Sequence, residues 1–294
     1  MVLFIREQAE VGCKIDDTWR PLEGVARVVE FPDPEKTLGA LYLPNSFKPG
    51  LHLETKSEYT GRLHYYPSAG RLWEYALGLR SVISGEPSKL SISSPLPTMS
   101  IESRYKHTDT YARQWDAIVN RAVWRAEAEG IFEAELELAS KSVSTGSFNL
   151  ISGTPPDPIG AYTTTVKLDG STLATVVRIE IELNNNVETK YYLKGQGNSN
   201  PTDIFDLRRE IRTRVTINPE DFTVYDKLRG TLPHSLSMKV ERSTDNYAEF
   251  SLENGVIRTG ALNIPETGLV DEEFEMEFRN IEIFLKGDFD TPFG

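Results

Sequence analysis

Three short segments of the sequence alternate acidic and apolar residues, and they hold the clearest potential for chemistry. They span residues 132–138, 179–183 and 273–278. Because successive side chains of a strand point to opposite faces, each segment should place carboxylates on one face and apolar side chains on the other. The carboxylates are those of Glu133, Glu135, Glu137, Glu180, Glu182, Glu273, Glu275 and Glu277.

Two interpretations of this acidic pattern remain open. Like charges along one strand face repel, at a cost of roughly a few tenths of a kcal/mol for each close pair. A solvent-exposed sheet face tolerates that cost. Alternatively, the carboxylates line a lumen through which a polyanion slides without binding. In that case the apolar neighbours face the core, namely Leu136, Leu138, Ile181, Phe274 and Met276.

A basic cluster lies between residues 203 and 214. Arg208, Arg209 and Arg212 occur there together with Asp206 and Glu210. Arginine forks bind phosphate or carboxylate groups in two-point contacts. A phosphate site is possible, but the acidic neighbours favour salt bridges. We predict that these three arginines form salt bridges between subunits.

The sequence lacks the motifs of common enzymes. No histidine has a cysteine or a second histidine at metal-ligand spacing, and neither the serine nucleophile elbow nor the phosphate-binding loop occurs. A carboxylate pair for glycoside hydrolysis stays possible, yet nothing distinguishes one pair among so many acids. We therefore predict no enzymatic activity, no catalytic residues, no metal and no cofactor.

Composition narrows the class of protein further. The chain has 294 residues, a formal net charge of −12 and one cysteine, Cys13. A groove that grips nucleic acid needs a positive surface, so this charge argues against that role. One cysteine cannot form an internal disulfide. No apolar run is long enough for a signal peptide or a membrane span, so we expect a soluble protein made in a cytoplasm, without membrane contact.

One stretch of the chain occurs twice. Arg62–Gly78 aligns without a gap on Arg214–Gly230, with Pro67 on Pro219. Both copies alternate apolar and polar residues, turn at the proline, continue for a short helix and stop at a glycine. Further matches are Leu96-Pro97 with Leu232-Pro233, Thr108–Ala112 with Thr244–Ala248, and Gly130 with Gly268.

The length of this repeat indicates duplication of a whole domain. At about 140 residues it is far too long for a solenoid unit. The best linker is the Ser-, Gly- and Pro-rich stretch at 144–160. We predict two domains, 1–150 and 151–294. The first carries an extended N-terminal arm with one or two strands over residues 1–50 and a loop insertion over residues 79–98.

The periodicity predicts an all-β fold with one short helix in each domain. We expect a hairpin from 163–168 and 172–183 with its turn at Asp169-Gly170. A helix is expected at 70–77, and a helical alternative stays open for 115–128. The other predicted strands are 57–66, 99–105, 117–128, 131–138, 187–193, 235–242, 247–252, 256–263 and 272–285.

The order of these elements resembles the tail tube proteins of tailed viruses. In the second half the resemblance rests on Thr165–Gly170, Val177–Glu188, Arg208–Ile217 and Val224–Leu228. In the first half it is weaker, and rests on Gly61–Tyr65, Leu72–Gly78 and Glu133–Leu138. It covers about 57–143 and 163–285, and residues 1–50 match nothing in the family.

The resemblance implies tandem β-sandwich or small-barrel domains, each with a flanking helix. Subunits form rings, and stacked rings make the tube that DNA crosses. A duplicated domain implies a pseudo-hexameric ring of three chains, with a hexameric ring as the alternative. Implied partners are further copies of the chain, the tape measure, terminator and baseplate proteins, and DNA in transit without specific binding. The location implied is the virion tail.

Two other classes of function remain open. One is a tube or baseplate hub component of a related injection machine. The other is a surface-binding β-sandwich module that uses tryptophans as contacts for glycans. Trp73, Trp115 and Trp124 fit core or interface anchors better than sugar-binding platforms.

Overall fold

Strands make up nearly all of the regular structure. The structure is a computed structural model that describes residues 9–30, 34–42, 49–105, 111–147, 157–191, 203–218, 233–263 and 271–291. Within these ranges there is a single α-helix, which is one turn long. The all-β fold predicted from periodicity is thus confirmed. No helix in the described ranges is long and apolar enough to cross a bilayer.

The first half of the chain contributes ten strands and one helical segment. Their bounds are β1 (Ala9–Ile15), β2 (Thr18–Pro21), β3 (Gly24–Glu30), β4 (Pro34–Tyr42), β5 (Pro49–Pro67), η1 (Arg71–Trp73), α1 (Glu74–Leu77), β6 (Gly78–Ser81), β7 (Ser88–Ile92), β8 (Met99–Tyr105), β9 (Tyr111–Glu127) and β10 (Glu133–Ser147).

The second half is also built from strands. The bounds are η2 (Ala161–Thr163), β11 (Thr164–Leu168), β12 (Ser171–Thr172), β13 (Val176–Asn184), β14 (Glu188–Lys190), β15 (Asp203–Phe205), β16 (Glu210–Ile217), β17 (His234–Ser243), β18 (Asn246–Asn263), β19 (Asp271–Phe278), β20 (Asn280–Lys286) and η3 (Gly287–Phe289).

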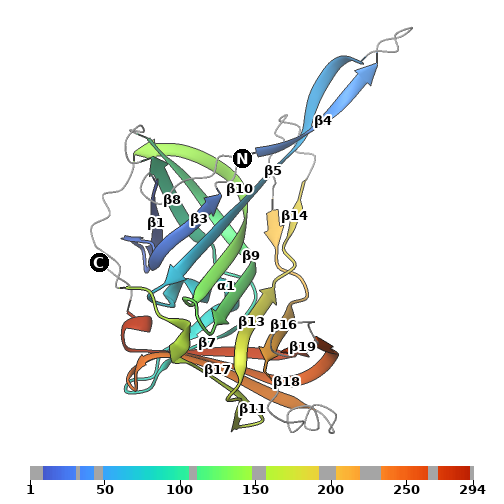
Figure 1. The fold of residues 1–294 in the computed structure, drawn as a ribbon. Coiled ribbons are helices and arrows are strands. Elements are labelled where there is room, and N and C mark those ends of the chain that lie inside the picture. Colours follow the sequence, from blue (N-terminus) through green and yellow to red (C-terminus); the bar gives the residue numbers. More distant parts are fainter. Residues whose placement is uncertain are drawn as a thin grey trace.

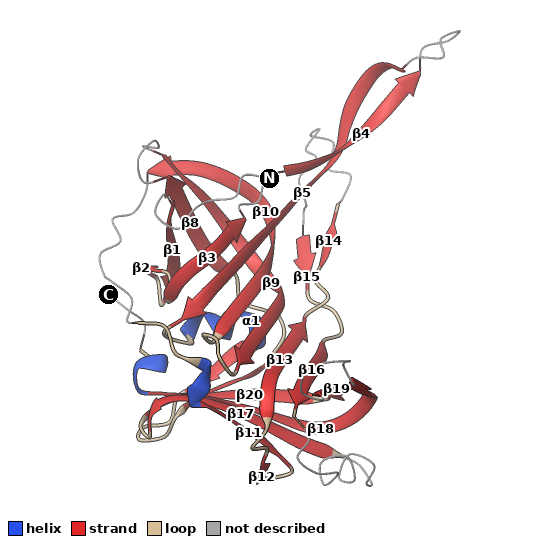
Figure 2. Ribbon diagram, in the orientation of Figure 1, coloured by secondary structure: helices blue, strands red, loops and turns tan. Residues whose placement is uncertain are grey.

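One antiparallel ladder runs through both halves. Its strand order is β3–β5–β10–β9–β13–β16–β19–β18, and we call it the long sheet. The two halves join in this sheet where β9 pairs with β13. The outer part of β5 pairs with β4 instead, and Figure 2 shows this hairpin projecting away from the rest of the molecule.

A second layer of strands covers one face of the long sheet. In the first half, the opening part of β9 and the end of β10 leave the long sheet and continue the ladder through β8, β1 and β2. The first part of β18 also lies in this second layer. It pairs with β17 on one side, followed by β11 and β12, and with β20 on the other side, followed by β7 and β6 of the first half. Figure 1 shows β17 and β18 running across the direction of β13 and β16.

The core between the layers joins the two halves. Trp73 from η1 packs against Trp124 of β9, with ring centroids 6.0 Å apart, and against Phe250 of β18 at 5.4 Å. Phe132 also contacts Trp73 and Phe250. All four rings are fully buried. Because Phe250 belongs to the second half, the halves share one apolar core.

Several turns form as their residues predict. Asp169 and Gly170 have φ values of 49° and 75°, the conformation of a two-residue hairpin turn. Gly78 ends α1 with φ 111°, as expected of a glycine after a helix C-terminus. The counterpart helix predicted after Pro219 falls outside the described residues.

Other expectations were wrong. In the described part of residues 1–50, β1, β2 and β3 are not an extended arm but belong to the two layers, and only β4 lies in the projecting hairpin with β5. The predicted loop at 79–98 contains the β6–β7 hairpin. The helical alternative for 115–128 is excluded, since β9 is paired on both sides. The segments 247–252 and 256–263 form the single strand β18, and 272–285 is divided into β19 and β20.

Candidate functional site

The eight predicted carboxylates lie on the long sheet, on β10, β13 and β19. Their apolar neighbours Leu136, Leu138, Ile181, Phe274 and Met276 are at most 4% exposed. This burial confirms that the acidic residues occupy the face away from the core. We call it the charged face.

The glutamates on this face differ in exposure. The Glu135 side chain is only 2% exposed and that of Glu180 is 11% exposed. The Glu137 side chain reaches 38% and that of Glu273 reaches 53%. A carboxylate as buried as that of Glu135 requires compensating partners.

Arginines from neighbouring strands supply those partners. Arg125 on β9 donates from Nε to Glu180 at 2.6 Å and from Nη1 to Glu135 at 2.9 Å. Arg121, four residues earlier on the same strand, contacts Glu137 and Glu182, each at 2.8 Å. Each arginine therefore connects a glutamate of β10 with a glutamate of β13.

The same alternation of charge extends across the long sheet. Acidic strands β10, β13 and β19 alternate with strands β5, β9 and β16, which carry arginine on this face. Further contacts join Arg62 to Glu135 at 2.8 Å, Arg27 to Glu133 at 2.6 Å, His64 to Glu133 at 3.1 Å, Arg214 to Glu273 at 3.2 Å and Arg258 to Glu277 at 2.6 Å. The charged face is a lattice of ion pairs rather than a bare acidic surface.

The pKa values of the glutamates reflect this pairing. Burial by itself would raise the pKa of Glu135, but hydrogen bonds from Arg62 and Arg125 outweigh it and the pKa lies below its usual value. Glu180 behaves in the same way, with Arg125 as its strongest partner. A hydrogen bond to Glu182 raises the pKa of Arg121 despite its partial burial. The carboxylates of Glu135 and Glu180 and the guanidinium group of Arg125 are therefore charged at neutral pH.

In the second predicted group, Arg208, Arg209 and Arg212, the side chains of Arg209 and Arg212 bind different partners. Arg209 is 9% exposed and donates to the carbonyls of Leu77 and Ser93 and, at 3.1 Å, to Asp206. It thus connects the second half to the end of α1 within the same chain. Arg212 pairs with Glu210 at the surface. A role of these residues between subunits stays a prediction.

Sequence analysis did not predict that arginines organise the charged face. They are Arg62, Arg121, Arg125 and Arg214. Each lies directly across the ladder from an acidic residue. The signal available in the sequence was the presence of alternating strands of opposite charge. Using that signal requires knowing which strands are neighbours.

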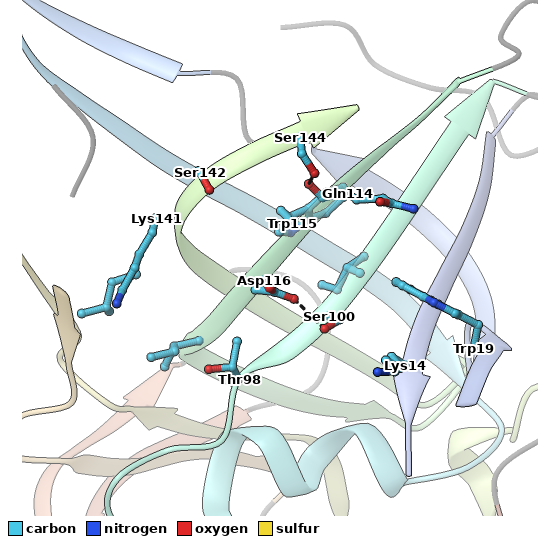
Figure 3. A pocket seen from close by; sticks show the side chains of 13 residues that line it. Lys14, Trp19, Thr98, Ser100, Gln114, Trp115, Asp116, Lys141, Ser142 and Ser144 are labelled. Carbon is cyan, nitrogen blue, oxygen red and sulfur yellow. Dashed lines mark hydrogen bonds between the residues drawn. The ribbon is translucent and has the colours of Figure 1, made fainter. Parts of the chain in front are cut away.

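A polar cavity of about 520 Å³ lies away from the charged face, on β1, β2, β8, β9 and β10. Figure 3 shows Lys14 and Trp19 on one side of it and Ser100 beside Asp116 on the other. Ser100 donates to Asp116 at 2.5 Å. Trp115 also lines it but is only 4% exposed, so that ring offers little surface to a sugar. No group of three or more potential metal ligands occurs in the described part of the chain.

Comparison with known proteins gives a family. A family model described as phage tail tube protein matches residues 45–277, which include most of the long sheet. No curated protein matches. The match spans well over half of the sequence and contains all eight carboxylates of the charged face, so the chain belongs to the phage tail tube protein family.

Proposed function

We propose that the protein is the subunit of a tail tube in which three chains form each ring, rings stack, and the charged face lines a lumen for DNA. Membership of the family already makes it a structural component of the virion tail that assembles with itself and with other tail proteins. The ring size, the lumen and the passage of DNA are the proposal. So are the tape measure, terminator and baseplate proteins as its partners.

The observation that carries the proposal is that the long sheet consists of two similar four-strand units, β3–β5–β10–β9 and β13–β16–β19–β18. The second strand of each unit, β5 or β16, has an arginine that lies opposite an acidic residue on each of its two neighbouring strands. The matching sets are Glu30, Arg62 and Glu137 in the first unit, and Glu180, Arg214 and Glu275 in the second. The sequence repeat independently aligns Arg62 with Arg214.

Irregularities in the ladder also match. The register of β3 shifts at Arg27, and that of β13 shifts at Val177. On the other side, β9 has its shift at Asn120 and β18 has one at Arg258. Bulges of this kind are specific features of a fold rather than random defects. Their agreement supports a duplicated domain, with the boundary between 1–150 and 151–294.

A duplicated unit favours a ring of three chains. Each chain supplies two similar units in one continuous sheet, so three chains supply six units around an axis. Closing the ring pairs the sheet edges that would otherwise promote aggregation. A ring of six chains remains the alternative and would contain twelve units.

The charged face suits a wall past which DNA slides. On this face Arg125 and Arg121 each form hydrogen-bonded ion pairs with two glutamates. A phosphate could bind such an arginine only by displacing its glutamate, which would leave a partly buried carboxylate without a partner. The wall therefore offers few free cations to hold the DNA backbone.

Electron microscopy of the purified protein, combined with mass measurement in solution, tests the proposal. We expect stacked rings with three copies of the 33.1 kDa chain and six similar lobes in each ring. A ring of six chains would overturn the stoichiometry. A monomer that persists at high concentration would overturn the tube and favour a hub component or a surface-binding module. The burial of Trp73, Trp115 and Trp124 already weighs against the glycan-binding form of that module.

A further inference from the structure

The long sheet has two open edges within the described residues. At one end, β3 pairs only with β5. At the other end, residues 256–263 of β18 pair only with β19. Both edges expose backbone donors and acceptors that would pair with another strand.

The junction between the two halves shows how such edges fit together. There β9, the last strand of the first unit, pairs antiparallel with β13, the first strand of the second unit. In this junction Arg125 lies opposite Glu180, and the two side chains form an ion pair at 2.6 Å.

The matching registers identify the residues that would occupy these positions in another copy of the chain. Arg125 lies opposite Glu133 in the ladder, and Asn263 lies opposite Asp271 at the corresponding step of β18 and β19. On the other edge, Glu30 lies opposite Arg62 just as Glu180 lies opposite Arg214. Asn263 therefore holds the register position of Arg125, and Glu30 that of Glu180.

We propose that β18 of one chain pairs antiparallel with β3 of the next chain, with Asn263 directly opposite Glu30. This inference rests on the proposed ring and specifies its joint. The joint reproduces the strand pairing between the halves of one chain but lacks its central ion pair. Within the described residues Glu30 makes no ion pair, and asparagine at 263 brings no charge. Each chain-to-chain joint is held by backbone pairing, without an arginine bridge.

Cysteine cross-linking tests the register. Directly opposed residues of antiparallel strands have Cα atoms about 4.5–5.5 Å apart, within the range of a disulfide. Under oxidising conditions, the variant carrying Glu30→Cys and Asn263→Cys should run as a covalent trimer on non-reducing gels. The native Cys13 is fully buried, and each single variant reports any linkage through it.

A matched control shifts one cysteine along the same strand. The variant with Glu30→Cys and Ala261→Cys places the pair diagonally, about 7–8 Å apart, and should cross-link at least fivefold less. If the shifted pair links as well as the direct pair, or if neither links in protein that forms normal tubes, the register is wrong while the tube stands. If the unsubstituted protein forms no rings at all, both the tube and the joint fail.

A gain of stability tests the missing ion pair. Asn263→Arg should recreate across the joint the contact that Arg125 makes with Glu180. Assembly should then begin at about two- to fivefold lower protein concentration, and Glu30→Gln in the same chain should remove that gain. Glu86→Gln, a neutralisation outside the long sheet, should leave the gain intact. Equal assembly of the unsubstituted protein and the three variants, or a gain that survives Glu30→Gln, would overturn the pairing of positions 30 and 263.

Discussion

Arg125 connects glutamates from the two halves of the chain. It contacts Glu135, which is 2% exposed, and Glu180, which is 11% exposed. Removing one partner of a buried ion pair costs more than the pair itself contributes, because a carboxylate is left buried without compensation. The arginine is therefore more important for stability than a surface salt bridge would be.

We predict that Arg125→Met lowers the free energy of unfolding by about 2 kcal/mol, measured by urea denaturation at pH 7. Arg178→Met is the matched control, because Arg178 contacts the same Glu180 at 3.3 Å but is 47% exposed. That variant should lose less than about 0.5 kcal/mol. Equal losses in both variants would contradict a special role for the buried carboxylate.

Glu23 is a buried carboxyl group whose pKa is raised rather than lowered. Its side chain is fully buried and accepts a hydrogen bond from the backbone N–H of Leu72 at 2.9 Å, at the start of η1. Burial raises the pKa of Glu23 to about 8, although hydrogen bonds and the Arg71 charge oppose the shift. Because the folded state holds this proton more tightly than the unfolded state, unfolding releases it between about pH 4.5 and pH 8.

Because unfolding releases a proton, the contribution of Glu23 to the free energy of unfolding should fall as pH rises from about 4.5 to about 8. Above that range its contribution should stay constant. Glu23→Gln retains an acceptor for Leu72 but carries no titratable group. The difference in unfolding free energy between Gln and Glu should therefore shift in favour of Gln by several kcal/mol between pH 5 and pH 9. A constant difference over this range would show that Glu23 titrates normally.

At the scale of elements, α1 is held by the second half of the chain. Asn185, fully buried, donates from its side-chain amide to the carbonyl of Ala76 at 3.0 Å and to that of Val119 at 2.9 Å. Arg209 binds the next carbonyl, that of Leu77, at 3.1 Å. Since the last carbonyls of a helix have no partner within it, these two side chains cap α1 from across the junction.

Asn185→Ala should therefore destabilise the protein by about 2 kcal/mol, because two carbonyls each lose a donor in the core. Asn185→Asp should cost at least as much at pH 7, since aspartate keeps the shape but loses the donor and adds a buried charge. Urea denaturation gives both values. A loss below about 0.5 kcal/mol for Asn185→Ala would mean that water or a neighbouring group replaces the amide.

Elements with strong local signals were predictable from the sequence. Period-two alternation located β8, β10 and β13, and the glycine at 78 located the end of α1. Before residue 50 the sequence predicted only one or two strands where the structure has β1 to β4, because the prolines there mask the alternation. The lattice on the charged face was missed for another reason. Arg125 and Glu180 are far apart in sequence, and only the pairing of β9 with β13 makes them neighbours.

For the whole molecule, the distribution of charge matters more than its sum. The net charge is −12, yet the acidic residues on the charged face are largely paired with arginine. DNA passing this face would meet alternating and mutually satisfied charges, with the excess acid elsewhere contributing a field of longer range. At physiological salt that field acts over about 8 Å, a distance relevant inside a pore.

The wall charge can be tested by reversing its more exposed acids. Glu137→Lys with Glu273→Lys changes two side chains that are 38% and 53% exposed and leaves the buried carboxylates of Glu135 and Glu180 in place. Tubes should still form, because the apolar face of each strand is unchanged. The new lysines and the arginines released from their partners should bind phosphates and slow DNA ejection at least severalfold, more so at low salt. Glu86→Lys with Glu253→Lys is the matched control, because Glu253 lies in the part of β18 that pairs with β20 and not with β19. This variant has the same change of charge and should eject DNA normally. If both double variants eject DNA at the unsubstituted rate, the charged face does not line the path of the DNA.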